Sequence, residues 1–122
     1  MFALSNNNQS SEDLSDDEVV FISKSIGTVV ATAYAHERSI NARQIYFSPL
    51  EMIGRYAHEG AVLFYGDNDP LADCRTIEKI AQEKKLELHR VKGGNHSLET
   101  GDVHKDIENL RRIMLRVDEI VK

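Results

Sequence analysis

Residues 19–27 read VVFISKSIG, a short apolar run that leads into a turn of small residues. Four consecutive β-branched or aromatic residues, Val19 to Ile22, are typical of a strand that is buried on both faces, as in a parallel sheet. Residues 26–37 follow with a glycine and several alanines, which favour a helix packed closely on that sheet. The stretch therefore predicts a strand, a tight turn at Ser25 and a helix.

The alternation of strand and helix continues along the rest of the chain. Short apolar runs predict strands, and apolar residues at three- and four-residue steps predict helices. Further strands are predicted at residues 44–47, 61–65 and 86–91, and further helices at 50–57, 73–84 and 102–121. Strands that alternate with helices imply a parallel sheet with right-handed crossovers. The predicted fold class is α/β, a parallel sheet of about four strands with flanking helices.

Composition divides the chain of 122 residues into a tail and one domain. Residues 1–17 contain a run of serine, asparagine and aspartate with few apolar residues, so we expect a flexible polar segment. Residues 18–122 carry all the predicted strands and helices. That length is enough for a single domain with a modest hydrophobic core.

Charge and residue usage exclude several classes of protein. The formal net charge is -5 and the basic residues form no stripe, so nucleic acid is not an expected partner. No apolar run has the length of a membrane span, and no secretory signal is visible, so we expect a cytoplasmic protein without a membrane partner. The five histidines lack metal-ligand spacing, and no cofactor is expected. Cys74 stands alone and is interpreted as a small side chain early in a helix.

Three polar loops follow predicted strands and carry the residues of chemical interest. Ser25 follows the first strand, Asp69 lies in the loop GDNDP at 66–70, and His96 lies in the loop GGNHS at 93–97. In open parallel sheets, ligands bind beyond the carboxyl ends of the strands. The sequence therefore predicts that a serine, an acid and a histidine meet at one edge of the sheet.

These three residue types can act together as a nucleophilic unit. A serine hydroxyl is a weak nucleophile that needs a base, which His96 can supply, and the base needs an orienting partner, which Asp69 can supply. Each residue also has a structural interpretation: a helix N-cap for Ser25, a turn residue for Asp69 and a loop histidine for His96. Asp67 is the alternative acid. The joint occurrence in this order favours the catalytic interpretation.

The motifs resemble those of the α/β-hydrolases. Residues 19–35 resemble the family's nucleophile elbow, after which the acid and the histidine follow in this chain order. Residues 66–71 resemble the acid loop, and residues 93–98 resemble the histidine loop of small dienelactone-hydrolase-like members. The resemblance covers about residues 18–122 and implies the C-terminal half of the fold only.

The resemblance implies a role for individual residues. It makes Ser25 the nucleophile, Asp69 the acid and His96 the base of a catalytic triad, and it makes the backbone N–H of Ile26 an oxyanion donor. Ser23 stands where the family pattern has a glycine, and its small side chain suits the same crowded turn. The second oxyanion N–H of the family belongs to the first half of the fold, for which this sequence offers no counterpart.

Two functional hypotheses follow. The first is a serine hydrolase acting on a small ester, thioester or related acyl compound. The second is a non-catalytic remnant that acts as an interaction or self-associating module. In the second case Val19 to Ser23 would form an exposed edge strand, which invites pairing with another copy of the chain. A flavodoxin-like receiver domain is disfavoured because no acid pair follows the first strand.

Overall fold

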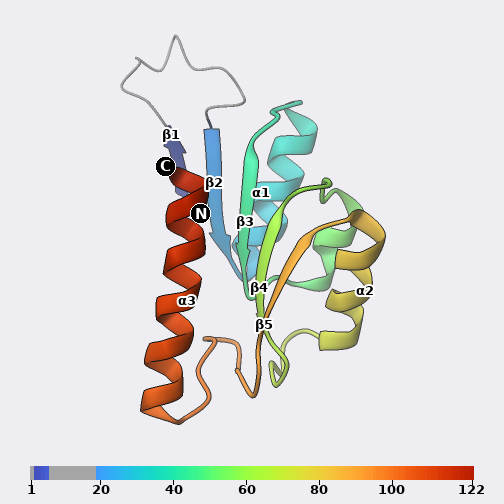
Figure 1. The fold of residues 1–122 in the computed structure, drawn as a ribbon. Helices are drawn as coiled ribbons and strands as arrows, with labels where there is room; N and C mark the ends of the chain where they lie inside the picture. Colours follow the sequence, from blue (N-terminus) through green and yellow to red (C-terminus); the bar gives the residue numbers. More distant parts are fainter. Residues whose placement is uncertain (1, 6–18) are drawn as a thin grey trace.

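The structure is a computed structural model that describes residues 2–5 and 19–122 (Figure 1). Its elements alternate between strand and helix, as the sequence predicts. In chain order they are β1 (Phe2–Ser5), β2 (Val19–Lys24), α1 (Ile26–Glu37), β3 (Arg43–Phe47), the 3₁₀ helix η3 (Glu51–Arg55), β4 (Val62–Gly66), α2 (Cys74–Lys84), β5 (Glu87–Val91) and α3 (Val103–Val121).

The strands form one sheet in the order β1-β2-β3-β4-β5. Strands β2 to β5 run parallel to one another, and β1 is antiparallel to β2. The predicted class is confirmed, since four parallel strands with flanking helices make up the body of the molecule. Parallel neighbours place the carboxyl ends of β2 to β5 at the same edge of the sheet.

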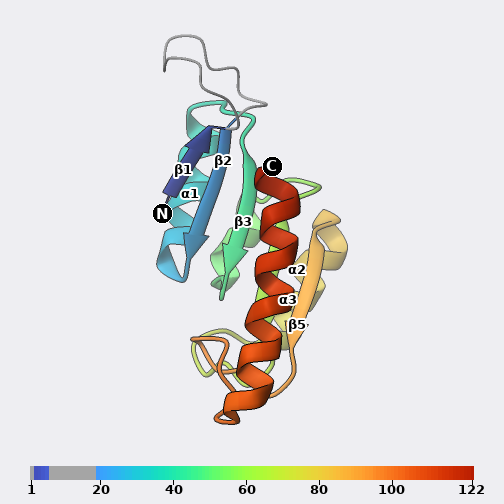
Figure 2. The same cartoon turned by 60° about the vertical axis from the view of Figure 1, so that its left-hand side comes forward.

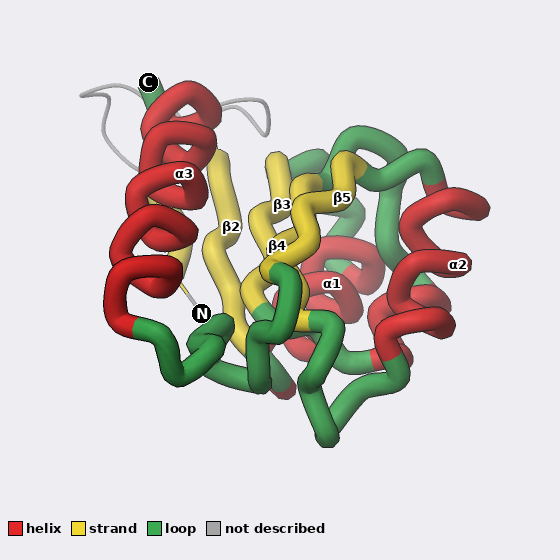
Figure 3. The backbone as a smooth tube through the Cα atoms, turned by 60° about the horizontal axis from the view of Figure 1, so that its bottom comes forward, coloured by secondary structure: helices red, strands yellow, loops and turns green. Residues whose placement is uncertain are grey.

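Helices cover both faces of the sheet (Figures 2 and 3). One face carries α1, η3 and α2, and its core includes Tyr46, Leu63 and Ile77. The other face carries α3, whose Ile113 packs with strand residues such as Ile45 on that side. Neighbouring residues of β3 thus serve opposite cores, because successive side chains of a strand point to opposite faces.

Burial along the strands follows their place in the sheet. All five residues of β4 are buried, because β4 has a strand on each side and helices on both faces. In β5 the exposure alternates, as expected for a strand that has a neighbour on one side only. The sequence predicted strands at both places, residues 61–65 and 86–91.

The N-terminal residues correct one expectation. The sequence placed Phe2–Ser5 in the flexible segment 1–17, but they form β1, which pairs with β2 from Phe2↔Ile22 to Ser5↔Val19. The expectation that Val19 to Ser23 forms an exposed edge was therefore wrong. Unpaired backbone groups along an edge favour the addition of a strand, and this chain supplies one. The rest of the segment, residues 1 and 6–17, lies outside the described residues.

The helix predicted over 50–57 is the second difference. The structure has the five-residue 3₁₀ helix η3 there, with Leu50 in an extended conformation before it. A short segment can form a 3₁₀ helix, because i→i+3 hydrogen bonds are rarely sustained over longer runs. Gly54 of η3 lies against Ile80 of α2, where a Cβ would approach within 3.1 Å. The segment acts as a tight spacer between β3 and β4.

Candidate active site

The turn between β2 and α1 lies at the carboxyl edge of the sheet (Figure 3). Ser25, the first candidate residue, occupies this turn. Ser25 has φ 55° and ψ −126°, a conformation that non-glycine residues rarely adopt. Its N–H donates to the carbonyl of Phe47 at 3.0 Å, and its own carbonyl accepts from the N–H and the Oγ1 of Thr28 at 2.9 and 2.6 Å. The strained backbone is thus fixed by neighbours in β3 and α1.

His96 lies between the serine and the acid. Its Nε2 is 2.7 Å from the Oγ of Ser25, and its Nδ1 is 2.7 Å from the Oδ2 of Asp69. A carboxylate oxygen can only accept, so Nδ1–H donates to Asp69 and Nε2 is left to accept from the Ser25 hydroxyl. The His96 side chain is 21% exposed and can therefore be reached from solvent.

Asp69 is more deeply buried than Asp67, the other acid of the loop. Its side chain is 4% exposed, and its second oxygen, Oδ1, accepts from the N–H of Leu71 at 2.8 Å. Both oxygens of the carboxylate are therefore engaged. An acid that is buried and bonded in this way keeps the imidazole of His96 in one orientation.

The carboxylate of Asp67, the alternative acid, is hydrogen-bonded to Arg90 and Gly93. Its Oδ2 accepts from Arg90, at 2.8 Å from Nε and 2.6 Å from Nη2, and its Oδ1 accepts from the N–H of Gly93 at 2.6 Å. Burial alone would raise the pKa of Asp67, but these hydrogen bonds outweigh it and lower the pKa. Asp67 therefore ties the acid loop to β5 and to the start of the histidine loop.

The acid loop and the histidine loop approach each other closely at two glycines. A Cβ on Gly66 would lie 2.2 Å from the carbonyl oxygen of Gly94, so only glycine fits at this position. The same carbonyl accepts from the N–H of Asn68 at 2.9 Å. This contact brings Asp69 within reach of His96.

Ser48, which directly follows β3, contacts the backbone of the histidine loop. It is 1% exposed, has φ 47°, and donates from Oγ to the carbonyl oxygen of His96 at 2.6 Å. Its N–H donates to the carbonyl of Phe64 at 2.8 Å. The sequence marks Ser48 only as a polar residue directly after a predicted strand, and its contact with His96 depends on how loops from different strands pack.

Ile26 follows Ser25 directly, and Ser23 lies two residues before it. Ile26 is the first residue of α1, so its N–H has no acceptor one turn earlier within the helix. That N–H follows Ser25 directly, at the start of α1. Ser23 is buried beneath the turn, where its Oγ has no hydrogen-bond partner within the described residues.

Three other features of the sequence can be compared with the structure: a metal site, the single cysteine and a membrane-spanning helix. Within residues 2–5 and 19–122, no three histidine, cysteine, aspartate or glutamate side chains are grouped so as to hold a metal ion. Cys74 is a partly buried free thiol at the start of α2. Over the same residues, no helix combines the length and the apolar character that crossing a membrane requires.

Comparison with known proteins identifies the fold. No model of a known protein family matches the sequence, and no curated protein matches it. Solved structures do match. An α/β serine hydrolase homologue from Coxiella burnetii superposes with a TM-score of 0.61 at 16% identity over 80% of this chain. The predicted CIB-like hydrolase from Thermoplasma acidophilum superposes with a TM-score of 0.61 at 17% identity over 84% of this chain. Esterase 2 from Thermogutta terrifontis superposes with a TM-score of 0.55 at 15% identity over 80% of this chain.

These similarities establish the architecture. The chain has the strand and helix arrangement found in α/β-hydrolases. It spans about half the length of the structures that it matches, with 47%, 50% and 55% of those chains covered.

Proposed function

We propose that this chain is a serine hydrolase that cleaves small esters, thioesters or related acyl compounds. The observation that carries the proposal is the continuous hydrogen-bonded series from Ser25 through His96 to Asp69, with both links at 2.7 Å. These distances suit proton transfer, for which donor and acceptor must lie about 2.6–3.2 Å apart. The fold similarity to hydrolases and an esterase supports the same reaction class.

The reaction would proceed in two stages. The Oγ of Ser25 attacks the carbonyl carbon while its proton passes to Nε2 of His96, and the N–H of Ile26 stabilises the negative oxygen. The bond from the carbonyl carbon to the leaving oxygen or sulfur then breaks, and His96 returns the proton to the leaving group. Water repeats the sequence on the acyl-serine, which releases the acid and restores Ser25.

Asp69 and Ser48 would act through His96 and not on the substrate. Asp69 accepts from Nδ1–H and stabilises the imidazolium that forms during attack. Ser48 holds the backbone of His96, so it fixes the position from which the ring works. Both are positioning residues in this scheme.

The oxyanion donors set our expectation for the rate. We assign one donor, the N–H of Ile26, within the described residues. Loss of a single donor typically lowers the rate by about 100- to 1,000-fold. We therefore expect slow turnover, in which a stable acyl-serine or phosphoryl-serine adduct is easier to observe than multiple turnovers.

The finer assignment concerns the kind of hydrolase. The histidine loop at 93–98 resembles that of small dienelactone-hydrolase-like enzymes, and we keep that subfamily as part of the proposal. The Thermogutta terrifontis esterase 2 has been solved phosphonylated by cyclosarin and phosphorylated by paraoxon. By analogy, we expect Ser25 to react with organophosphates as well as with acyl compounds.

We place the reaction in the cytoplasm.

Hydrolysis of p-nitrophenyl esters tests the proposal. The wild-type chain should release p-nitrophenol from acetate or butyrate esters above the background rate, and Ser25→Ala should return the rate to background. Thr76→Ala is a matched control, because Thr76 is a hydroxyl residue on α2 whose Oγ1 donates to Asp73. Equal rates for wild type and Ser25→Ala, in well-folded samples, would exclude the proposed enzyme.

The second candidate function is a self-associating module, and one feature of α3 favours it. Four of the exposed apolar side chains of α3 recur at four-, three- and four-residue steps: Val103, Ile107, Leu110 and Met114. That spacing is the one along which two helices pack side by side. A second copy of the chain is the occupant that we propose for this stripe.

Light scattering tests the second candidate. If the stripe joins two copies, wild type should behave as a dimer and the double variant Ile107→Glu, Leu110→Glu as a monomer. Both replaced side chains are more than half exposed, so the fold should tolerate the change. A wild-type monomer at high concentration would eliminate this candidate.

A further inference from the structure

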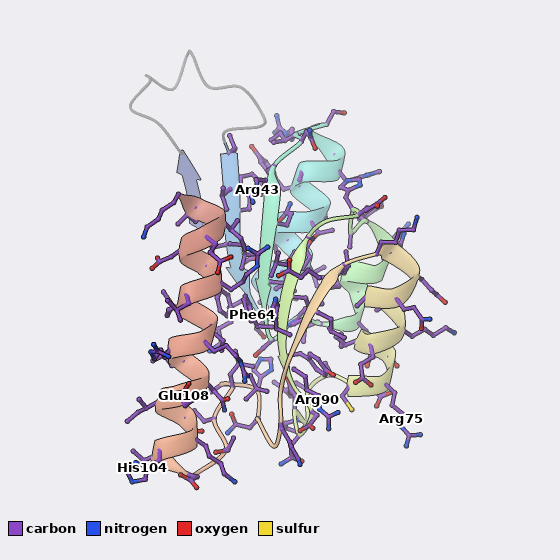
Figure 4. All side chains as sticks on the ribbon, viewed as in Figure 1. Arg43, Phe64, Arg75, Arg90, His104 and Glu108 are labelled. Carbon is purple, nitrogen blue, oxygen red and sulfur yellow. The ribbon has the colours of Figure 1, made fainter. Side chains whose placement is uncertain are left out.

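A groove of about 620 Å³ lies between the carboxyl ends of β2 and β3 and residues 103–114 of α3. We call it the α3 groove. Its volume falls within the range of about 300–1,000 Å³ that is usual for small-molecule sites. Figure 4 labels His104 and Glu108 on the stretch of α3 that borders it. Residues 97–99 complete the lining, so the loop that carries the proposed catalytic base forms part of the wall.

The α3 groove borders the proposed catalytic pair. Lys24, the residue before Ser25, and Ser97, the residue after His96, both line it. Phe47 lines it as well, and the carbonyl of Phe47 accepts from the N–H of Ser25 at 3.0 Å. The Oγ of Ser25 and the Nε2 of His96 are 2.7 Å apart. A molecule held in the groove therefore has the nucleophile and the base at its border.

The walls of the α3 groove are mostly apolar. Ile22 and Phe47 contribute from the strands, and Ile107, Leu110 and Met114 contribute from α3. The three α3 residues are 62%, 58% and 45% exposed, so water now covers apolar surface that a ligand would cover instead. Removal of such surface from water is a main source of binding free energy.

The charged residues of the α3 groove leave it suited to an uncharged ligand. The carboxylate of Asp106 accepts from the N–H and the Oγ1 of Thr100, at 2.8 and 2.7 Å. Lys24 and Glu99 are exposed, so their charges stay in water. No charge in the lining has to be stripped of its partners when an apolar group enters.

The α3 groove is long in one direction. Residues 103–114 cover roughly 16 Å of helix, at about 1.5 Å of rise per residue. An unbranched eight-carbon chain has seven carbon–carbon bonds of about 1.5 Å and is therefore shorter than about 11 Å. The length of the groove thus accommodates a linear chain of this size, with room to spare.

We infer that the α3 groove binds the acyl chain of the substrate, and that this chain is apolar, unbranched and about eight carbons long. The scissile carbonyl lies at Ser25, and the chain runs along α3. This inference rests on the proposed hydrolase function and adds to it the class of acyl group. It competes with the second candidate function, because a second copy packed on Ile107 and Leu110 would occupy the same groove.

The p-nitrophenyl esters of acetate and octanoate differ only in the acyl chain and test the inference. Burial of one methylene group corresponds to about two- to fourfold in affinity, so the six additional methylenes should raise kcat/KM by about 100-fold or more, after subtraction of the spontaneous rate. Leu110→Asp should lower this octanoate-to-acetate ratio about tenfold. Leu115→Asp is the matched control, because Leu115 is a similarly exposed leucine of α3 outside the lining of the groove.

Three results of the ester series would overturn the inference. The first is an equal kcat/KM for the two esters, and the second is an equal fall of the ratio in Leu110→Asp and Leu115→Asp. The third is a preference for octanoate that vanishes at protein concentrations where light scattering shows a dimer, since a second copy would then be the occupant of the groove.

Binding without turnover separates the inference from the hydrolase proposal. Octanamide, which has an amide in place of the ester, is titrated into Ser25→Ala while methyl resonances are followed by NMR. The methyls of Ile107, Leu110 and Met114 should shift, and those of Leu115 should not. Shifts confined to other methyls, or no shifts, would overturn the inference. The expected shifts without any ester turnover by wild type would instead overturn the hydrolase proposal alone.

Discussion

At the scale of single residues, the site depends on a few side chains whose backbones are held in unusual conformations. Ser25 and Ser48 both have positive φ values, 55° and 47°, and both lie directly after parallel strands. Such conformations cost about 1–3 kcal/mol each and persist where surrounding contacts fix them. Here those contacts are hydrogen bonds to Phe47, Thr28 and Phe64. These conformations direct the hydroxyl of Ser25 toward the imidazole of His96 and the hydroxyl of Ser48 toward the carbonyl oxygen of His96.

The two aspartates of the acid loop should respond differently to the same substitution. Asp69→Asn removes the acceptor that orients His96, so we expect ester hydrolysis to fall by about 1,000- to 10,000-fold with little loss of stability. Asp67→Asn weakens the link to Arg90 and Gly93, so it should lower the melting temperature and largely preserve the rate. Paired measurements of kcat and thermal unfolding check both. Equal loss of activity in the two variants would contradict the assignment of Asp69.

At the scale of elements, α3 is fastened to the sheet by an ion pair as well as by its apolar face. Arg116 donates from Nε and Nη2 to the two oxygens of Glu87, both at 2.7 Å, and His89 lies beside the same carboxylate. The Arg116 guanidinium holds the pKa of Glu87 at about 2. A carboxyl whose pKa is lower in the folded state contributes stability above its unfolded pKa of 4.5. That contribution is lost as pH falls from about 4.5 to 2.

Replacement of Arg116 by methionine should reveal this contribution. At pH 7 we expect Arg116→Met to lower the free energy of unfolding by about 1 kcal/mol, because both side chains are about one-third exposed and solvent screens the pair. The difference from wild type should shrink as pH falls toward 2. Denaturant unfolding at several pH values measures it. The more exposed Arg111→Met is the control, and a pH-independent difference would contradict the interpretation.

At the scale of the whole molecule, the added strand β1 closes one side of the sheet. It pairs with β2 along Val19–Ser23, the stretch that the sequence predicted as an exposed edge. A chain that begins at residue 6 would uncover those backbone groups, and we expect it to self-associate more strongly than the full chain. Sedimentation at several concentrations measures this. Identical behaviour of the two chains would show that the β2 edge does not drive association.

Much of the fold was predictable because its signals are local. Val19 to Ile22 and Ala61 to Tyr65 read as buried strands, and apolar residues at three- and four-residue steps predicted the last helix. The strand β1 was not predicted, since four residues before a polar run have too little pattern to mark a strand. Its formation depends on the free edge of β2, which is a property of the assembled sheet.

The candidate site was predictable in outline and not in detail. Chain order and strand ends selected Ser25, Asp69 and His96, because parallel strands bring their carboxyl ends together. The part played by Ser48 and the close approach of Gly66 to Gly94 could not be read from the sequence. Both depend on how loops from different strands pack against one another, which no local pattern encodes.

The account depends most on the reactivity of Ser25, and the mass of a covalent adduct tests it directly. Incubation with a fluorophosphonate, followed by intact-mass and peptide analysis, should show one adduct per chain, located on Ser25. The adduct should be absent from Ser25→Ala and should form far more slowly in His96→Ala. A folded wild-type chain that acquires no adduct, or an adduct that persists in Ser25→Ala, would contradict the central claim.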